Sequence, residues 1–214
     1  MSKNAKTQLP DILPIFPLSG VLLLPRGHLP LNIFEPRYLA MIDEALKTHR
    51  MIGMIQPQNY GGQDLFEVGC AGRIVSYEET GDGRYLISLE GVSRFKVKKE
   101  LELQNGFRRI QPDWSDFDSD QEPMSCLDLN KSKLLELLQK YFEHEGLSCD
   151  WDAIENSEDE KLITALAMIC PFDASEKQVL LESSCCKERA KTFLTMLDMA
   201  VKSETSIHTS ETHH

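Results

Sequence analysis

Residues 12–38 read ILPIFPLSGVLLLPRGHLPLNIFEPRY, and the architecture of the chain begins to show in this stretch. Three short apolar runs, Ile12–Leu18, Val21–Leu24 and Leu29–Phe34, are separated by prolines and glycines. Such runs are typical of short strands. Proline cannot donate a hydrogen bond to a neighbouring strand, so the prolines within and beside the runs predict edge or bent strands, as in a small barrel.

A helix and further strands are expected after this stretch. Pro36 suits the first turn of a helix, and five apolar residues follow at helical spacing, namely Tyr38, Met41, Ile42, Ala45 and Leu46. Strands are predicted at Met51–Gln56, Val68–Tyr77, Tyr85–Leu89 and Val92–Leu103. Gly81-Asp82-Gly83 predicts a hairpin turn. Phe95 alternates toward the core, and the alternation fails at Lys99, which indicates a bulge or a bend.

The composition changes after these strands. Residues 111–125 are acidic and rich in turn formers, which predicts a solvated connector and a domain boundary near residues 115–124. Four helices are expected beyond it: Leu127–His144, one opened by a capping box at Ser157 and Glu160, one opened at Ser175 and Gln178, and Cys186–Lys202. Strands followed by helices predict an α+β fold. The expected domains are a flexible N-terminus (1–10), a β-barrel (11–118), a helical bundle (119–203) and a flexible tail (204–214).

Charge and cysteine content narrow the function classes. The 214 residues carry 23 lysines and arginines against 34 aspartates and glutamates, a net charge of −11. This charge disfavours a nucleic-acid or membrane-surface partner. No apolar run resembles an export signal or a membrane span, and the six cysteines form no C-x-x-C pair, so we expect reduced thiols in a cytoplasmic protein. Cys185 and Cys186 are interpreted as two thiols at the start of a helix.

A search for catalytic motifs yields none. The chain has no P-loop, no dinucleotide-binding glycine motif, no H-E-x-x-H and no G-x-S-x-G nucleophile turn. His28 would act as a base only beside a nucleophile, and a surface position is preferred. The acidic connector lacks the spacing of a calcium loop. We therefore expect a protein that is not an enzyme and that holds neither a metal nor a cofactor.

Several blocks together resemble the Lon protease N-terminal domain family, in its stand-alone bacterial form. They keep the order and spacing of that family over residues 11–203 and lie at Leu13–Leu18, Val21–Pro25, Leu29–Tyr38, Ile52–Pro57, Val68–Ile74 and Asp82–Phe95. The resemblance implies a PUA-like β-barrel with one internal helix, followed by a C-terminal helical bundle. It also implies recognition of protein substrates, because the ATPase and Ser–Lys protease modules of the full-length protease lie in later domains.

The resemblance favours a non-catalytic module that binds unfolded or exposed hydrophobic protein segments, as a monomer or weak dimer, with a protease or chaperone as a further partner. Residues proposed for peptide binding are Phe34, Glu35, Arg37, Tyr38 and Met41. Alternatively, this turn is a strand-to-helix corner with Arg37 in a structural pair, and the groove between the two domains is a second candidate surface. Two further hypotheses are a module that binds one specific small ligand or partner in the barrel mouth, and an RNA-binding PUA-like protein.

Overall fold

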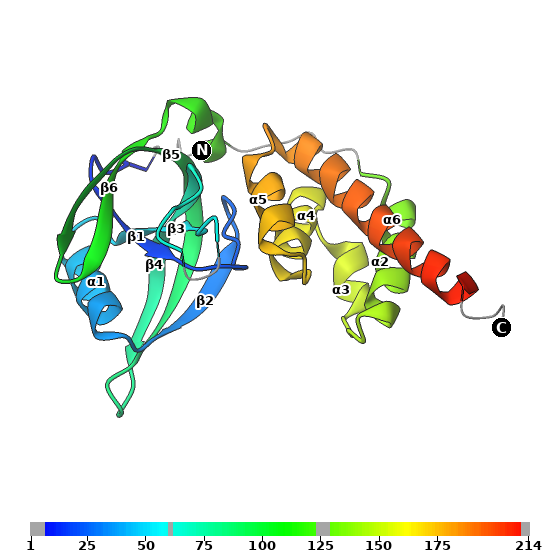
Figure 1. Ribbon diagram of the computed structural model, residues 1–214, viewed down its shortest axis with the longest axis horizontal. Coiled ribbons are helices and arrows are strands. Elements are labelled where there is room, and N and C mark those ends of the chain that lie inside the picture. The colour runs from blue at the N-terminus through cyan, green and yellow to red at the C-terminus, as the bar shows by residue number, and fades with distance from the viewer. Residues whose placement is uncertain (1–6, 60–61, 123–128, 211–214) are drawn as a thin grey trace. The chain divides into compact units, whose positions relative to one another are not determined.

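The computed structural model describes residues 7–59, 62–122 and 129–210 (Figure 1). The chain divides into two compact units, of which unit 1 comprises Met1–Pro123 with Thr164–Glu182, and unit 2 comprises Met124–Ile163 with Ser183–His214. The expected division at residues 118–119 differs from this one, because it places Thr164–Glu182 with the later helices. Apart from one helix between the second and third strands, the strands precede the helices along the chain, and the predicted α+β class is confirmed.

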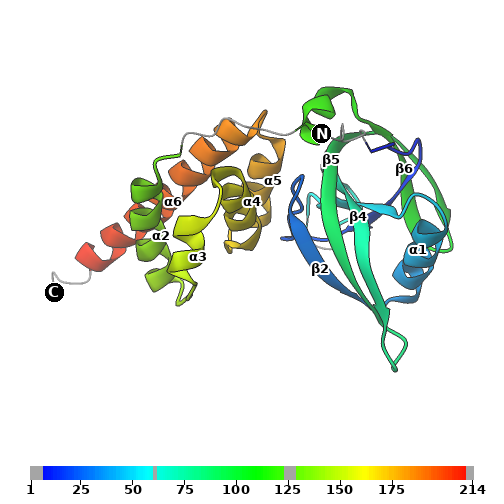
Figure 2. The same cartoon turned by 180° about the vertical axis from the view of Figure 1, so that it is seen from behind.

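Unit 1 is built around one mixed sheet of six strands. The strands are β1 (Leu13–Pro17), β2 (His28–Ile33), β3 (Met51–Ile55), β4 (Val68–Glu79), β5 (Tyr85–Gln104) and β6 (Phe107–Asp113). Their order is β2-β5-β4-β3-β1-β6, and a further pairing of β5 with β6 closes five of them into a ring. β2 pairs with β5 and stands at the edge of the sheet (Figure 2). The parallel pair is β1 with β3.

The prolines of the first strands occupy positions where a missing N–H is tolerated. Pro30 lies in the edge strand β2, as the sequence predicts. β1 is not an edge strand, because β3 and β6 flank it. Pro14 nevertheless pairs with β6 alone and Pro17 with β3 alone, so each proline has a partner strand on one side only.

Three strand predictions need correction. Val21–Leu24 is not a strand, but an irregular segment that buries Leu22, Leu23 and Leu24. Tyr85–Leu89 and Val92–Leu103 are parts of the single long strand β5, whose register shift between Val97 and Lys99 confirms the predicted bulge. The sequence does not predict β6, whose last residues, 111–113, fall within the expected connector.

The helix predicted from Pro36 is confirmed as α1 (Pro36–Lys47). Its buried face, which consists of Tyr38, Met41, Ile42 and Ala45, packs against β1, β3 and β6. The ring is filled by a separate apolar cluster that includes Leu13, Ile15, Met51, Ile55, Ala71, Phe95 and Ile110. Phe95 is fully buried, as its alternation predicts.

The acidic stretch after β6 is solvated only in part: Asp113, Asp116, Asp118 and Glu122 are exposed, as expected, but the stretch is folded and Asp120 is buried. Residues Ser115–Gln121 form the 3-10 helix η1, in which Phe117 and Asp120 are buried. Asp120 accepts hydrogen bonds from Arg94 Nε at 2.9 Å and Nη2 at 2.8 Å, and from the Arg94 backbone N–H at 2.9 Å. The acidic residue that the composition placed in solvent therefore anchors η1 to β5.

Helical residues also belong to unit 1. They are the second part of α4 (Asp159–Ile169) and α5 (Ala174–Glu182). α5 begins with a capping box of Asp173 and Glu176 rather than at Ser175 and Gln178. Gln178 instead points inward and donates to the Val68 carbonyl of β4 at 3.1 Å.

Unit 2 contains the remaining helices, α2 (Lys131–His144), α3 (Trp151–Asn156) and α6 (Cys186–Ser210), and α2 packs against α6. The helix predicted to open at Ser157 is α4, which begins at Asp159, and the Ser157 hydroxyl donates to the Ala153 carbonyl of α3 at 2.6 Å. α6 continues beyond the predicted end at Lys202, whereas residues 1–6 and 211–214 lie outside the described part of the chain. None of the described helices combines the length and apolar character that a membrane crossing requires.

Candidate functional site

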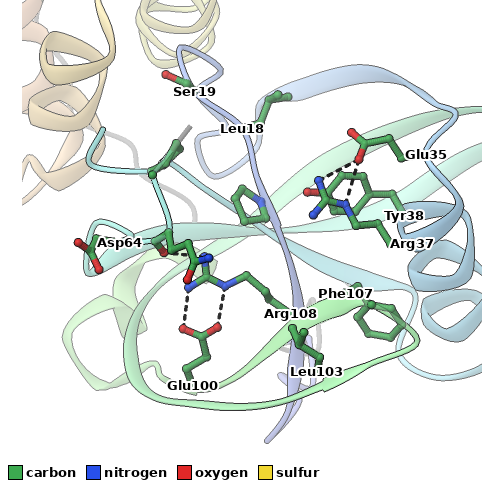
Figure 3. Close-up of a pocket in the computed structure, with 15 residues that line it drawn as sticks. Leu18, Ser19, Glu35, Arg37, Tyr38, Asp64, Glu100, Leu103, Phe107 and Arg108 are labelled. Atoms are coloured by element: carbon green, nitrogen blue, oxygen red, sulfur yellow. Dashed lines mark hydrogen bonds and ion pairs between the residues drawn. The ribbon is translucent and has the colours of Figure 1, made fainter. Parts of the chain in front are cut away.

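A groove of about 950 Å³ opens on unit 1, beside the start of α1 (Figure 3). One wall is the end of β1 with the residues that follow it, and another is the first turn of α1. The opposite side comes from the loop after β3 and from the β5–β6 hairpin. The lining residues are Pro17, Leu18, Ser19, Glu35, Arg37, Tyr38, Pro57, Gly62, Gln63, Asp64, Glu100, Leu103, Gly106, Phe107 and Arg108.

The charged side chains of the α1 wall are paired with each other. Glu35 is the N-cap residue, but its carboxylate does not cap the helix and instead binds Arg37 Nε at 3.0 Å and Nη2 at 2.8 Å. The Arg37 guanidinium lies 4.5 Å from the centre of the Tyr38 ring. The Tyr38 ring also packs on Phe16, with ring centres 4.2 Å apart. Burial of the phenol raises the pKa of Tyr38 above its usual value.

Three of the five residues proposed from the sequence meet in the groove, namely Glu35, Arg37 and Tyr38. Phe34 lies outside the lining, is 63% exposed, and has the Arg84 guanidinium 6.0 Å from its ring centre. Met41 is fully buried on the core face of α1, so its side chain is not presented to a ligand. Arg37 is paired with Glu35, as expected of a structural corner, and it also lines the groove, as expected of a binding residue. The two interpretations of this turn therefore do not exclude each other.

The opposite wall was missed by sequence reasoning. Arg108 of β6 makes two hydrogen bonds of 2.6 Å to the Glu100 carboxylate and one of 2.8 Å to the Gln63 carbonyl. These bonds tie β5, β6 and the loop after β3 together. The hairpin that places them turns at Asn105 and Gly106, both with positive φ. Asn-Gly between alternating residues is a strong hairpin signal and would have revealed this wall.

The Arg108–Glu100 pair separates the groove from a smaller hollow. That hollow measures about 310 Å³ and shares Gln63, Asp64, Glu100 and Arg108 with the groove. The groove itself offers exposed apolar surface, because Leu103 is 63% exposed at the hairpin. The arrangement therefore combines an apolar contact with fixed charged and carbonyl groups, which suits recognition of an extended polypeptide.

No cluster of three metal-ligating side chains occurs in the parts of the chain that the structure describes. The charges that line the groove are Glu35, Asp64 and Glu100 against Arg37 and Arg108. Both arginines are held by carboxylates, so the described lining residues do not present an unpaired cation to an anionic ligand.

The vicinal cysteines differ in environment. Cys185 precedes α6, where hydrogen bonds from the backbone N–H groups of Glu188 and Lys187 stabilise the thiolate and lower the pKa of the Cys185 thiol. Cys186 is buried. Burial also raises the pKa of Cys170 to about 12. The expected position of this pair at a helix start agrees with the bounds of α6.

We expect Cys185 to be the fastest of the five described cysteines to react with iodoacetamide at neutral pH, because it combines partial exposure with a favoured thiolate. Cys170 should stay unmodified until the protein unfolds. Timed alkylation followed by peptide mass spectrometry measures both rates. Faster labelling of Cys170 than of Cys185 in the native protein would contradict this expectation.

Comparison with known proteins identifies relatives of this architecture. Residues 12–199 match the family model of the ATP-dependent protease La (LON) substrate-binding domain. Lon protease 2 of Myxococcus xanthus is 26% identical over 90% of this chain and 24% of its own length. Lon protease of Cytophaga hutchinsonii is 27% identical over 95% of this chain and 27% of its own length. The chain thus spans about a quarter of these relatives.

A solved structure shows the same fold. The Lon N-terminal domain protein from Xanthomonas campestris superposes with a TM-score of 0.62 at 23% sequence identity, over 86% of this chain and 97% of that one. At this identity the similarity concerns the fold alone.

Proposed function

We propose that this chain, which belongs to the family of ATP-dependent protease La (LON) substrate-binding domains, is a non-catalytic module. It is proposed to bind protein segments in the groove of unit 1. The observation that carries this proposal is the meeting of Glu35, Arg37 and Tyr38 with an exposed apolar side chain, Leu103, around one groove of about 950 Å³.

The chemistry of the lining favours a polypeptide over a polyanion. A segment with an apolar side chain would bury Leu103, and its backbone would meet the polar groups of the rim. An RNA strand would face the carboxylates of Glu35, Asp64 and Glu100, while both arginines of the lining are already paired. The proposed ligands are unfolded or exposed hydrophobic protein segments.

The finer features of the proposal follow from the family. The ring of strands is proposed to be a PUA-like barrel, and the later helices a bundle. The proposed setting is the cytoplasm, with a protease or chaperone as a further partner and a monomeric or weakly dimeric protein.

The groove is tested by a matched pair of substitutions on β5. Leu103→Ser removes the apolar side chain at the groove, whereas Leu86→Ser removes an equally large one, 41% exposed, outside the groove lining. Burying a leucine contributes about 1.5–3 kcal/mol, so Leu103→Ser is expected to weaken binding about tenfold or more. Fluorescence anisotropy of a dye-labelled, reduced and carboxymethylated unfolded protein measures the affinity.

Equal affinities of the two variants would remove the groove as the binding surface. Tyr38 is a poorer test position, because the residue is only 6% exposed and removal of its ring would disturb the packing of α1. A parallel titration with a labelled RNA oligonucleotide at several salt concentrations tests the nucleic-acid hypothesis, since phosphate contacts impose a steep salt dependence.

A further inference from the structure

A helix that does not line the groove holds one of its walls in place. Leu18 and Ser19 belong to the lining, and Gly20 follows them with a φ of 74°. The Leu18 N–H is bonded to the Ile55 carbonyl at 3.0 Å, as a continuation of the β1–β3 pairing. Beyond Leu18 the segment leaves the sheet, so its position depends on other partners.

Gly20 is bound by side chains at both of its backbone polar groups. Its N–H donates to Gln56 Oε1 at 3.0 Å, and its carbonyl accepts from Lys177 Nζ at 2.9 Å. Both side chains are buried, Gln56 with 1% and Lys177 with 7% of its surface exposed. Both the N–H and the carbonyl of Gly20 are therefore held by buried side chains.

Both points lead to α5. Lys177 is a residue of α5 itself, and Gln56 Nε2 donates to the Ala174 carbonyl at 2.9 Å and to Gln178 Oε1 at 3.1 Å. Gln178 in turn donates to Glu182 at 2.7 Å and to the Val68 carbonyl of β4 at 3.1 Å. The network joins α5, the end of β3, β4 and the groove wall.

Burying the Lys177 ammonium group costs free energy, because the charge loses its hydration. Burial lowers the pKa of Lys177, because the protonated form loses hydration. A charged group in a protein interior therefore needs a hydrogen-bonding partner. Among the described residues, the partner of the Lys177 ammonium is the Gly20 carbonyl.

We infer that α5 positions the Leu18–Gly20 wall of the groove, and that Gln56 and Lys177 are positioning residues for ligand binding. This inference rests on the proposed function of the groove. It predicts that a change in α5 reaches the ligand, although no residue of α5 belongs to the groove lining.

The test compares two Lys→Met variants. Lys177→Met keeps the chain length but removes the bond to Gly20. Lys131→Met is the control, because Lys131 Nζ also donates to backbone carbonyls, those of Ser157 at 2.6 Å and Glu155 at 3.2 Å, but these lie in unit 2. Hydrogen exchange of the Gly20 amide, followed by NMR, reports on the wall without any ligand.

Lys177→Met is expected to speed exchange of the Gly20 amide at least about tenfold, and to weaken binding of the labelled unfolded protein several-fold. Lys131→Met should change neither quantity. Unchanged Gly20 exchange in Lys177→Met overturns the inference. Faster exchange with unchanged affinity also overturns it when Leu103→Ser weakens binding, because the wall then moves without consequence.

Failure of this inference can be distinguished from failure of the proposed function. If Leu103→Ser and wild type bind equally, the groove is not the binding surface, and the Gly20 exchange alone decides whether α5 holds the wall. If Lys177→Met does not fold, the wild-type protein gives the answer. Saturation with the unfolded protein should then slow amide exchange at Gly20 and within α5, and unchanged exchange at both would refute the inference.

Discussion

Replacing Asp120 with alanine is expected to lower the free energy of unfolding by about 3–5 kcal/mol, because it leaves the Arg94 guanidinium charged and buried. The side chains of Arg94 and Asp120 are 2% and 7% exposed. Asp120 binds both the side chain and the backbone N–H of Arg94. Arg94 Nη1 also donates to the Leu181 carbonyl of α5 at 3.1 Å, and the guanidinium lies 4.5 Å from the Phe117 ring centre. One substitution therefore weakens the attachment of η1, β5 and α5 together.

Urea unfolding followed by circular dichroism measures this loss. Asp116→Ala is the matched control on the same 3-10 helix, because Asp116 pairs with Lys96 and both side chains are about half exposed, 55% and 47%. That control should leave the urea midpoint unchanged. The double variant Arg94→Met with Asp120→Leu should recover much of the stability, since it removes both buried charges. A midpoint for Asp120→Ala equal to that of the control would contradict the role assigned to the pair.

Gly91→Ala is expected to have the second largest effect. A Cβ atom at Gly91 would lie 2.0 Å from the Leu24 carbonyl oxygen and 2.8 Å from its carbonyl carbon. These are backbone atoms, so no flexible side chain can move away. The segment is also fixed on both sides, by bonds from Arg26 N–H to the Gly91 carbonyl at 2.7 Å and from Gly91 N–H to the Gly27 carbonyl at 2.9 Å. The added methyl group must displace β5 from this segment, at a cost of about 1–3 kcal/mol or more.

Gly81→Ala serves as the control for Gly91→Ala, because a Cβ at Gly81 meets nothing within 4 Å. Thermal unfolding should show a lower Tm for Gly91→Ala and an almost unchanged Tm for Gly81→Ala. Similar values for the two variants would show that the Leu24 carbonyl yields easily, and that the close approach of the two segments is not a constraint.

Periodicity in the sequence predicted the elements whose apolar residues face one side. α1 is the clearest case, because Tyr38, Met41, Ile42 and Ala45 recur at helical spacing and are all buried. The bulge near Lys99 was also visible as a break in alternation. Composition, in contrast, predicted a solvated position for Asp120, which is buried. An acidic run does not indicate which of its carboxylates pairs with a buried arginine. That pairing joins residues 26 positions apart and depends on the tertiary fold.

The candidate site was predictable to the same limited extent. The turn at Glu35–Tyr38 could be singled out because a proline and charged residues mark the start of a helix. Arg108 and Glu100 could be reached only through the Asn105-Gly106 hairpin signal. Gln56 could not be recognised, because a glutamine at the end of a strand has no pattern that distinguishes a buried hydrogen-bonding residue from an exposed one.

The composition of unit 1 from two separate stretches of chain bears on how the protein is made. During synthesis the strands emerge first, and the residues that bind Gly20, Gln56 and Val68 from α5 follow only after residues 124–163. At translation rates of about 5–20 residues per second, the nascent ring waits on the order of several seconds for α5. Throughout that interval the groove wall lacks its anchor. In a ribosome stalled before residue 174, Gly20 would thus lack its bond to Lys177, and Gln56 its bonds to α5.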